Sequence, residues 1–155
     1  MTDISVIIPS NHSHHALMKV VRSLCQQKMK PAEIVIVDSS LECGECPAEV
    51  TNACAFSGIR LIYVHLAHAL PGRARNIGLA LTRAELIAFI DVQTIPKPNW
   101  LEKTSNLLTN NPILGVWGST HFNADTMFER LVRDGFFGVQ PRRTLPGSVF
   151  DRKVF

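Results

Sequence analysis

The chain has 155 residues, of which 46% are hydrophobic and 19% charged, and its formal net charge is +3. This balance excludes a disordered chain, and the length allows a buried core without disulfide or metal staples. The mild charge, with no basic stripe of interleaved aromatic residues, argues against nucleic acid as a partner. Because there is no signal segment and no apolar run near the ~20 residues that span a bilayer, we expect a cytoplasmic protein without a membrane segment.

The first half of the chain alternates between predicted strands and helices. Ile4–Ile8 is apolar and β-branched, which is typical of a buried parallel strand. A helix follows, because four apolar residues share one helical face: Leu17, Val20, Val21 and Leu24. Ser13 is placed to cap it. Two more apolar runs, Ile34–Val37 and Leu61–Val64, predict a second and a third strand.

The second half continues the alternation with a helix over Gly72–Thr82 and a strand over Leu86–Ile90. Ile77 and Leu81 recur there at helical spacing, with Ala74 and Ala84 as further members of the pattern, so we expect this face to lie inward. Another helix begins at Pro98 and Asn99 and ends near Pro112. We expect its Leu101, Thr104 and Leu108 to face inward. Leu114–Trp117 predicts a fifth strand. Asp125–Phe137 then predicts a helix with Met127 and Leu131 inward, and Gly138–Ser148 a mobile loop.

This alternation predicts an α/β fold: a Rossmann-like, mostly parallel sheet flanked by helices. In open α/β sheets, ligands bind at the carboxyl ends of the strands. Pro9, Ser10 and Asn11 follow the first strand, Asp38 ends the second, and Asp91 ends the fourth. The sequence therefore predicts a ligand site that combines these polar groups.

The segment from Pro71 to Trp100 indicates what kind of ligand this is. Its helix begins with a glycine turn that carries Arg73 and Arg75. A helix N-terminus beside an arginine is suited to an anionic group such as a diphosphate. We expect Arg75 to pair with such a group and Arg73 to be a solvated charge on the helix.

Several motifs occur in an order that resembles the family 2 glycosyltransferases of the GT-A fold. The motifs are Ser5–Asn11, Ser23-Leu24 with Gln27, Glu33–Ser40, Ala74-Arg75-Asn76-Ile77-Gly78, Phe89-Ile90-Asp91 and Pro96–Leu101. Each motif alone is weak, but the ordered set, which covers roughly residues 4 to 120, is specific. The resemblance implies a nucleotide-sugar-binding α/β domain over residues 1–120 and the start of an acceptor-side region, partly flexible, over residues 121–155.

The resemblance also assigns roles to single residues. It implies that Pro9, Ser10, Asn11 and Asp38 contact the nucleoside, and that Arg75, Asp91 and Gln93 bind the diphosphate. In the family, the second carboxylate of an Asp-x-Asp triplet ligates Mg²⁺ or Mn²⁺. Here the triplet is Asp91-Val92-Gln93, so Asp91 and Gln93 are the expected metal ligands, with one charge fewer and a lower affinity. Ser39 stands where the family has a second acid beside Asp38.

The implied activity is inverting transfer of a sugar from a nucleoside diphosphate to an unknown acceptor. The family keeps its general base in an acidic motif, and the last residues, Ser148–Phe155, look like the stretch before it. Four downstream carboxylates remain, none in a matching motif: Asp125, Glu129, Asp134 and Asp151. We therefore expect the donor-binding half of such an enzyme, truncated before its acceptor half, with a possible homodimer covering exposed apolar surface near Phe136-Phe137.

Two other functions stay open. The first is a non-catalytic nucleotide-sugar-binding or scaffold module of the same fold. The second is a thiol oxidoreductase or zinc module that uses Cys43 and Cys46, which have Cys-x-x-Cys spacing. In the zinc module, Cys54 could be a third ligand. A dinucleotide-binding dehydrogenase is disfavoured, because Pro9–His15 lacks the glycine-rich turn that approaches a pyrophosphate.

Overall fold

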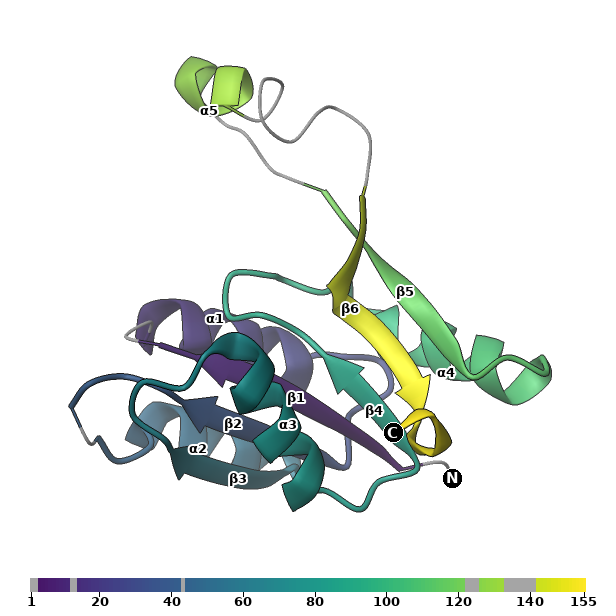
Figure 1. Cartoon of the computed structure of the whole chain (residues 1–155), viewed down its shortest axis with the longest axis horizontal. Helices are drawn as coiled ribbons and strands as arrows, with labels where there is room; N and C mark the ends of the chain where they lie inside the picture. Colours follow the sequence, from purple (N-terminus) through teal and green to yellow (C-terminus); the bar gives the residue numbers. More distant parts are fainter. Residues whose placement is uncertain (1–2, 12–13, 43, 122–125, 133–141) are drawn as a thin grey trace.

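A computed structural model describes residues 3–11, 14–42, 44–121, 126–132 and 142–155. Its centre is a six-stranded sheet in the order β3-β2-β1-β4-β6-β5 (Figure 1). The strands are β1 (Ile4–Ser10), β2 (Glu33–Asp38), β3 (Arg60–His65), β4 (Leu86–Phe89), β5 (Gly115–Thr120) and β6 (Arg142–Asp151). Strands β1 to β4 pair in parallel, and β6 is antiparallel to both β4 and β5. The predicted α/β class with a mostly parallel sheet is thus confirmed.

Helices cover both faces of this sheet. They are α1 (His14–Cys25), α2 (Ala48–Ser57), α3 (Pro71–Leu81), α4 (Trp100–Asn110) and the short α5 (Met127–Val132). Helices α1, α2 and α4 pack on one face and α3 on the other, and β5 and β6 extend beyond the body of the sheet toward α5 (Figure 1). Within the described ranges, each helix is too short or too polar to cross a membrane.

The two core layers follow from the alternation of side chains along each strand. In β1, Val6 and Ile8 face α1, α2 and α4, whereas Ile7 faces α3. All three are fully buried, and the same alternation repeats in β2 and β4. Strands buried on both faces read as continuous apolar runs, which is why the sequence located them.

The strand order changes direction beside β1. From β1 the chain builds outward to β2 and β3, and it then returns to β4 on the opposite side of β1. The chain that leaves β1 continues through α1 to β2, and the chain that leaves β4 continues through α4 to β5 on the other side of β1. Such a switch in strand order is where open α/β sheets bind their ligands.

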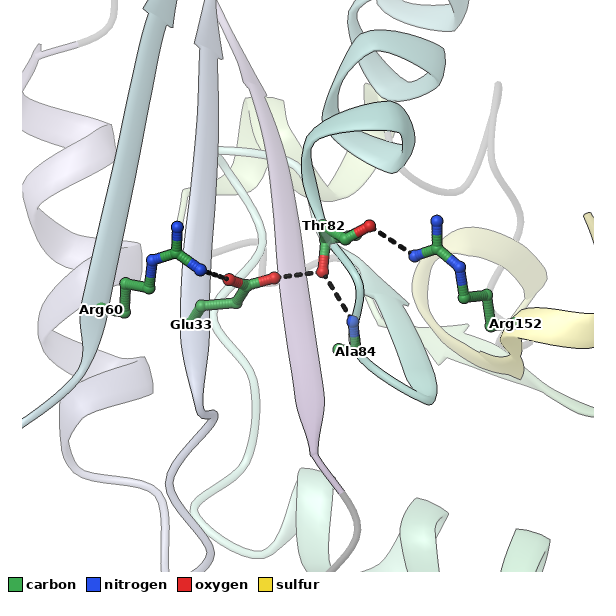
Figure 2. A network of polar contacts seen from close by, with 5 residues as sticks. All are labelled: Glu33, Arg60, Thr82, Ala84 and Arg152. Atoms are coloured by element: carbon green, nitrogen blue, oxygen red, sulfur yellow. Dashed lines mark hydrogen bonds and ion pairs between the residues drawn. The ribbon is translucent and has the colours of Figure 1, made fainter.

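The amino edge of the sheet is closed by a polar network (Figure 2). The buried Glu33 carboxylate accepts hydrogen bonds from the Thr82 hydroxyl and from the Arg60 guanidinium, the latter at 3.3 Å. Arg152, which follows β6, donates to the Thr82 carbonyl at 2.6 Å. This network joins β2, β3, the α3–β4 connection and the C-terminal 3₁₀ helix (Arg152–Val154), at the edge opposite the carboxyl ends of the parallel strands.

The expected loop over Gly138–Ser148 is wrong from Arg142 onward, where β6 begins; residues 138–141 lie outside the described residues. Pro146 and Gly147 suggested a loop because both disfavour regular strands. The structure accommodates them at an irregularity opposite Val116 and Gly118 in β5, where Gly147 has φ of 86°. The Trp100 indole donates to the Gly147 carbonyl at 2.9 Å and holds this irregular point against α4.

Other differences concern helices. Helix α2 was not predicted, because its apolar residues are spread around the helix and only Val50 and Cys54 are buried. In α3, Ala74 and Gly78 are buried, whereas Leu81 is 41% exposed and does not face inward as expected. In α5 the expected inward residues are also exposed, Met127 by 81% and Leu131 by 65%. The expected capping residue Ser13, and Asp125 and residues 133–137 of the expected last helix, lie outside the described residues.

Candidate functional site

The predicted site residues collect at the carboxyl edge of the sheet, around the end of β1. In the strand register, Ser10 pairs with Asp38, and Asp38 pairs with His65. On the other side of β1, Ile7 pairs with Phe89, so Asp91 lies about level with Pro9. Asn11 follows Ser10 and is exposed. The edge therefore places one carboxylate on each side of β1.

Asp91 and Arg75 form the ion pair at the centre of this edge. Arg75 Nη2 lies 2.6 Å from Asp91 Oδ1, and the two side chains are 17% and 40% exposed. The Arg75 Nε atom is buried and has no hydrogen-bond partner among the described residues. Asp91 is the more exposed member of the pair, and Arg75 reaches it from α3. Arg73, as expected, is exposed on the helix.

Asp38 lies in a second polar cluster at the end of β2. Its Oδ2 accepts hydrogen bonds from the Ser40 hydroxyl at 2.5 Å and from the Tyr63 hydroxyl at 2.9 Å. Its Oδ1 accepts a longer bond, of 3.4 Å, from the Ser40 amide. The carboxylate is 4% exposed and is fixed in orientation by these donors.

The turn after β1 is fixed by the same cluster. The Ser39 amide and hydroxyl both donate to the Ser10 carbonyl, at 2.8 and 2.9 Å. His65 Nε2 lies 2.9 Å from the Ser40 carbonyl, which ties the end of β3 to this loop. Sequence reasoning missed Tyr63 and Ser40. Tyr63 is the single tyrosine of the chain, but only the strand order shows that β3 lies beside β2 at this edge.

The residues expected to hold a divalent cation offer hard oxygen ligands. Asp91 is half-buried, Gln93 is exposed, and a turn closed by the bond from the Thr94 amide to the Asp91 carbonyl connects them. In the described part of the chain, no group of three or more His, Cys, Asp or Glu side chains is arranged to hold a metal ion. The two side chains thus fit a Mg²⁺ or Mn²⁺ ion that takes its other ligands from phosphate oxygens and water, and not a site built by protein alone.

Two of the four downstream carboxylates have other roles. Asp151 pairs with Leu86, at the amino edge of the sheet, and its Oδ1 accepts the Lys153 amide at 2.8 Å. Glu129 forms a capping box with Thr126, since each side chain accepts the other residue's amide, at 2.9 and 3.1 Å. Asp125 and Asp134 lie outside the described residues.

The described cysteines do not have the character of reactive thiols. Burial raises the pKa of the Cys46 thiol. Burial, with smaller contributions from Cys25 and Cys46, raises the pKa of the Cys54 thiol to about 12. Raised pKa values keep the Cys46 and Cys54 thiols protonated near neutral pH, where a reactive thiol is ionised. Cys43 lies outside the described residues, and Cys25 packs partly buried against the core.

The fold is thus an α/β sheet whose strand order switches beside β1, with Asp38, Arg75 and Asp91 at its carboxyl edge. The sequence model of Glycosyl transferase family 2 matches residues 5–152. The chain therefore belongs to glycosyltransferase family 2.

Similar proteins agree with this assignment. The pre-mycofactocin glycosyltransferase of Mycobacterium tuberculosis is 30% identical over 103 residues, which cover 64% of this chain and 20% of that protein. The structure of Staphylococcus aureus TarS residues 1–349 in complex with UDP-GlcNAc superposes with a TM-score of 0.71 at 15% identity, over 99% of this chain and 46% of that one. The mannosyltransferase PcManGT of Pyrobaculum calidifontis, in complex with GDP-Man and Mn²⁺, has a TM-score of 0.67 at 17% identity, over 97% and 45%.

These likenesses to solved structures confirm the fold, which is that of GT-A glycosyltransferases. The chain spans about a fifth of the length of the curated relatives it matches, from 20% to 24%.

Proposed function

We propose that this chain binds the nucleoside-diphosphate part of a sugar donor and serves in inverting transfer of the sugar to an acceptor hydroxyl. The observation that carries this proposal is the placement of Asp38 and the Arg75–Asp91 pair on either side of β1, at the carboxyl edge. These positions suit a donor that lies across β1. Its nucleoside would point toward Asp38, and its diphosphate toward Asp91 and the N-terminus of α3.

In this proposal each group at the edge has a distinct task. Asp38, held by Tyr63 and Ser40, accepts a hydrogen bond from a ring N–H of the nucleobase through Oδ1, its less engaged oxygen. Pro9, Ser10 and Asn11 contact the base or ribose from the turn after β1. Arg75 holds Asp91 in place and adds positive potential beneath the diphosphate.

Asp91 and Gln93 would hold a Mg²⁺ or Mn²⁺ ion against the diphosphate, where such an ion stabilises the charge of the leaving group. The oxygen ligands support this assignment, and so does the likeness to PcManGT, whose complex contains GDP-Man and Mn²⁺. Arg75 neutralises part of the Asp91 charge, and Gln93 adds none. We therefore propose a weak cation site that is completed only when the donor is bound.

The proposal is tested by thermal unfolding of the chain with UDP-, GDP-, dTDP- and CDP-sugars, each with Mn²⁺ and with EDTA. A donor at ~100 times its dissociation constant adds about 2.7 kcal/mol, a shift of a few degrees in Tm. We expect a nucleotide-selective shift that EDTA reduces. Asp91→Asn should abolish the dependence on Mn²⁺, because the neutral amide weakens both the cation site and the pair with Arg75.

Two further variants make the test specific. Gln93→Asp supplies a second carboxylate and should lower the Mn²⁺ concentration needed for the shift, on the order of tenfold. Asp151→Asn changes a carboxylate at the opposite edge and should leave the donor shift unchanged. If Asp91→Asn bound every donor as well as the wild type, with and without Mn²⁺, the site would be wrongly assigned.

A non-catalytic donor-binding module of the same fold is the second candidate. It is favoured by Gln93, which supplies no charge where the family has a second carboxylate. Donor binding without release of the sugar would identify such a module. For the enzyme, we propose that residues 1–120 supply the donor site and residues 121–155 begin the acceptor side.

A further inference from the structure

A buried glutamine connects the end of α1 to the loop that follows the Asp91-Val92-Gln93 turn. Gln27 is 3% exposed. Its Nε2 donates to the Lys97 carbonyl at 2.8 Å, and its Oε1 accepts from the Leu101 amide at 3.2 Å. Both ends of one side-chain amide therefore contact a segment about 70 residues away in sequence.

The side-chain amide of Gln27 takes the place of the N-terminal cap that α4 lacks. Asn99, at the N-cap position of α4, makes no side-chain capping bond, so the Leu101 amide would otherwise be an unsatisfied donor in a buried place. Among uncharged side chains of this length, only glutamine offers both a donor and an acceptor at its end. Glutamate lacks the donor for the Lys97 carbonyl, and methionine lacks both groups.

Backbone bonds fix the same loop at two further points. The Lys28 amide, next to Gln27, donates to the Pro98 carbonyl at 2.8 Å. At the start of the loop, the Thr94 amide donates to the Asp91 carbonyl at 2.9 Å. Only Ile95 and Pro96 lie between Thr94 and the clamped Lys97. Gln93 is thus held on a short connection whose two ends are both fixed.

We propose that Gln27 is a positioning residue of the donor site: it holds the loop after Asp91 so that the oxygens of Asp91 and Gln93 are ordered before the diphosphate and its cation arrive. The role of the loop in donor binding rests on the function proposed above. Groups bonded directly to a metal ligand typically change metal affinity 10- to 100-fold when they are removed. Gln27 acts through the backbone between Lys97 and Gln93, so we expect an effect at the lower end of this range.

The test uses Gln27→Met, which keeps the length of the side chain and loses both bonds, and Gln27→Glu, which keeps the acceptor and loses the donor. The matched control is Thr82→Val, which removes a buried hydrogen-bonding group from the network at the amino edge (Figure 2). All variants are compared with the wild-type chain at a temperature at which urea titration shows each to be folded.

Hydrogen exchange of the backbone amides gives the first readout and needs no ligand. In Gln27→Met we expect the Thr94, Trp100 and Leu101 amides to exchange at least tenfold faster than in the wild type, with a smaller change in Gln27→Glu. Thr82→Val should leave these amides unchanged. Equal exchange at the loop in Gln27→Met and wild type would overturn the proposal, whether or not any donor binds.

Titration calorimetry with UDP and with GDP, each in the presence of Mn²⁺, gives the second readout. We expect the affinity of Gln27→Met for the bound nucleotide to fall about tenfold and that of Thr82→Val to stay at the wild-type value. A loosened loop with unchanged affinity would also overturn the positioning role. If the wild type bound neither nucleotide, the proposed function would fail, and the exchange data would still decide whether Gln27 holds the loop.

Discussion

At the scale of the residue, Gly78 shows how one missing side chain sets the distance between a helix and the sheet. Gly78 is buried in α3, and a Cβ atom built there would lie 2.5 Å from Cγ2 of Ile7, which is itself fully buried in β1. The methyl group of Ile7 cannot move aside, because the core around it is closely packed. Gly78 therefore allows α3 to approach β1 and to place Arg75 beneath Asp91.

We expect Gly78→Ala to destabilise the protein by about 1–3 kcal/mol through overpacking, although alanine favours helix by about 1 kcal/mol. The control is Gly72→Ala in the same helix, because a Cβ atom there would meet nothing within 4 Å. That variant should be neutral or slightly stabilising. Urea unfolding of both variants measures the difference, and a stable Gly78→Ala would show that α3 can shift away from the sheet.

At the scale of the element, the interface between α1 and α2 is an apolar contact that contains thiols. Cys54 on α2 is 1% exposed, and Cys25 at the end of α1 donates to the Ala53 carbonyl at 3.6 Å. Burial raises the pKa of Cys54 to about 12, from an ordinary value of 9.0. The folded protein therefore keeps the thiol proton over a pH range in which the unfolded chain releases it.

This difference predicts the pH dependence of stability. Between pH 9 and about 12 the folded state binds more protons than the unfolded state, so the free energy of unfolding falls as the pH rises through that window. The contribution of Cys54 is complete below pH 9, and its loss amounts to at most about 1.4 kcal/mol per pH unit. Urea unfolding at pH 8 and pH 10.5 should show a smaller loss in Cys54→Ala than in the wild type. Equal losses would contradict a thiol that is protonated in the folded state.

At the scale of the whole molecule, the strand contributed by the C-terminal part lies inside the sheet. Strand β6 lies between β4 and β5, and its Val149 and Phe150 are 0% and 9% exposed. Phe150 also packs edge-on against Trp117 and Phe155, with ring centroids 5.5 and 6.0 Å apart. Residues 142–155 are therefore part of the sheet whose carboxyl edge carries the proposed donor site.

A chain that ends after residue 121 should consequently fail to fold cooperatively. It loses the burial of Val149 and Phe150, roughly 1.5–3 kcal/mol each, and leaves the facing edges of β4 and β5 unpaired. These losses are large against a total stability of about 5–15 kcal/mol. Near-ultraviolet circular dichroism and urea titration of the shortened chain provide the test. A cooperative transition at the wild-type midpoint would show that residues 1–121 fold independently of β6.

Most strands and helices of this protein could be predicted from the sequence alone, because the forces that form them act between residues that are close in sequence. The buried parallel strands are continuous apolar runs, and α1 and α4 follow a helical period that needs no knowledge of their neighbours. The order of these elements was sufficient to predict the α/β class, and the positions of the polar residues after each strand were sufficient to predict that they meet at the carboxyl edge of the sheet. Asp38 and Asp91 do lie at this edge, on either side of β1, and their part in binding stays a prediction.

Only the tertiary structure decided which distant groups meet. The pairing of Tyr63 with Asp38 and of Gln27 with the Lys97 loop depends on strand order and helix placement, which no local pattern encodes. Strand β6 contains a proline and a glycine that predict a loop, and it forms because β4 and β5 each offer it an edge. Local propensity is worth about a kilocalorie per residue, so a strand that completes a sheet and buries Phe150 overrides it.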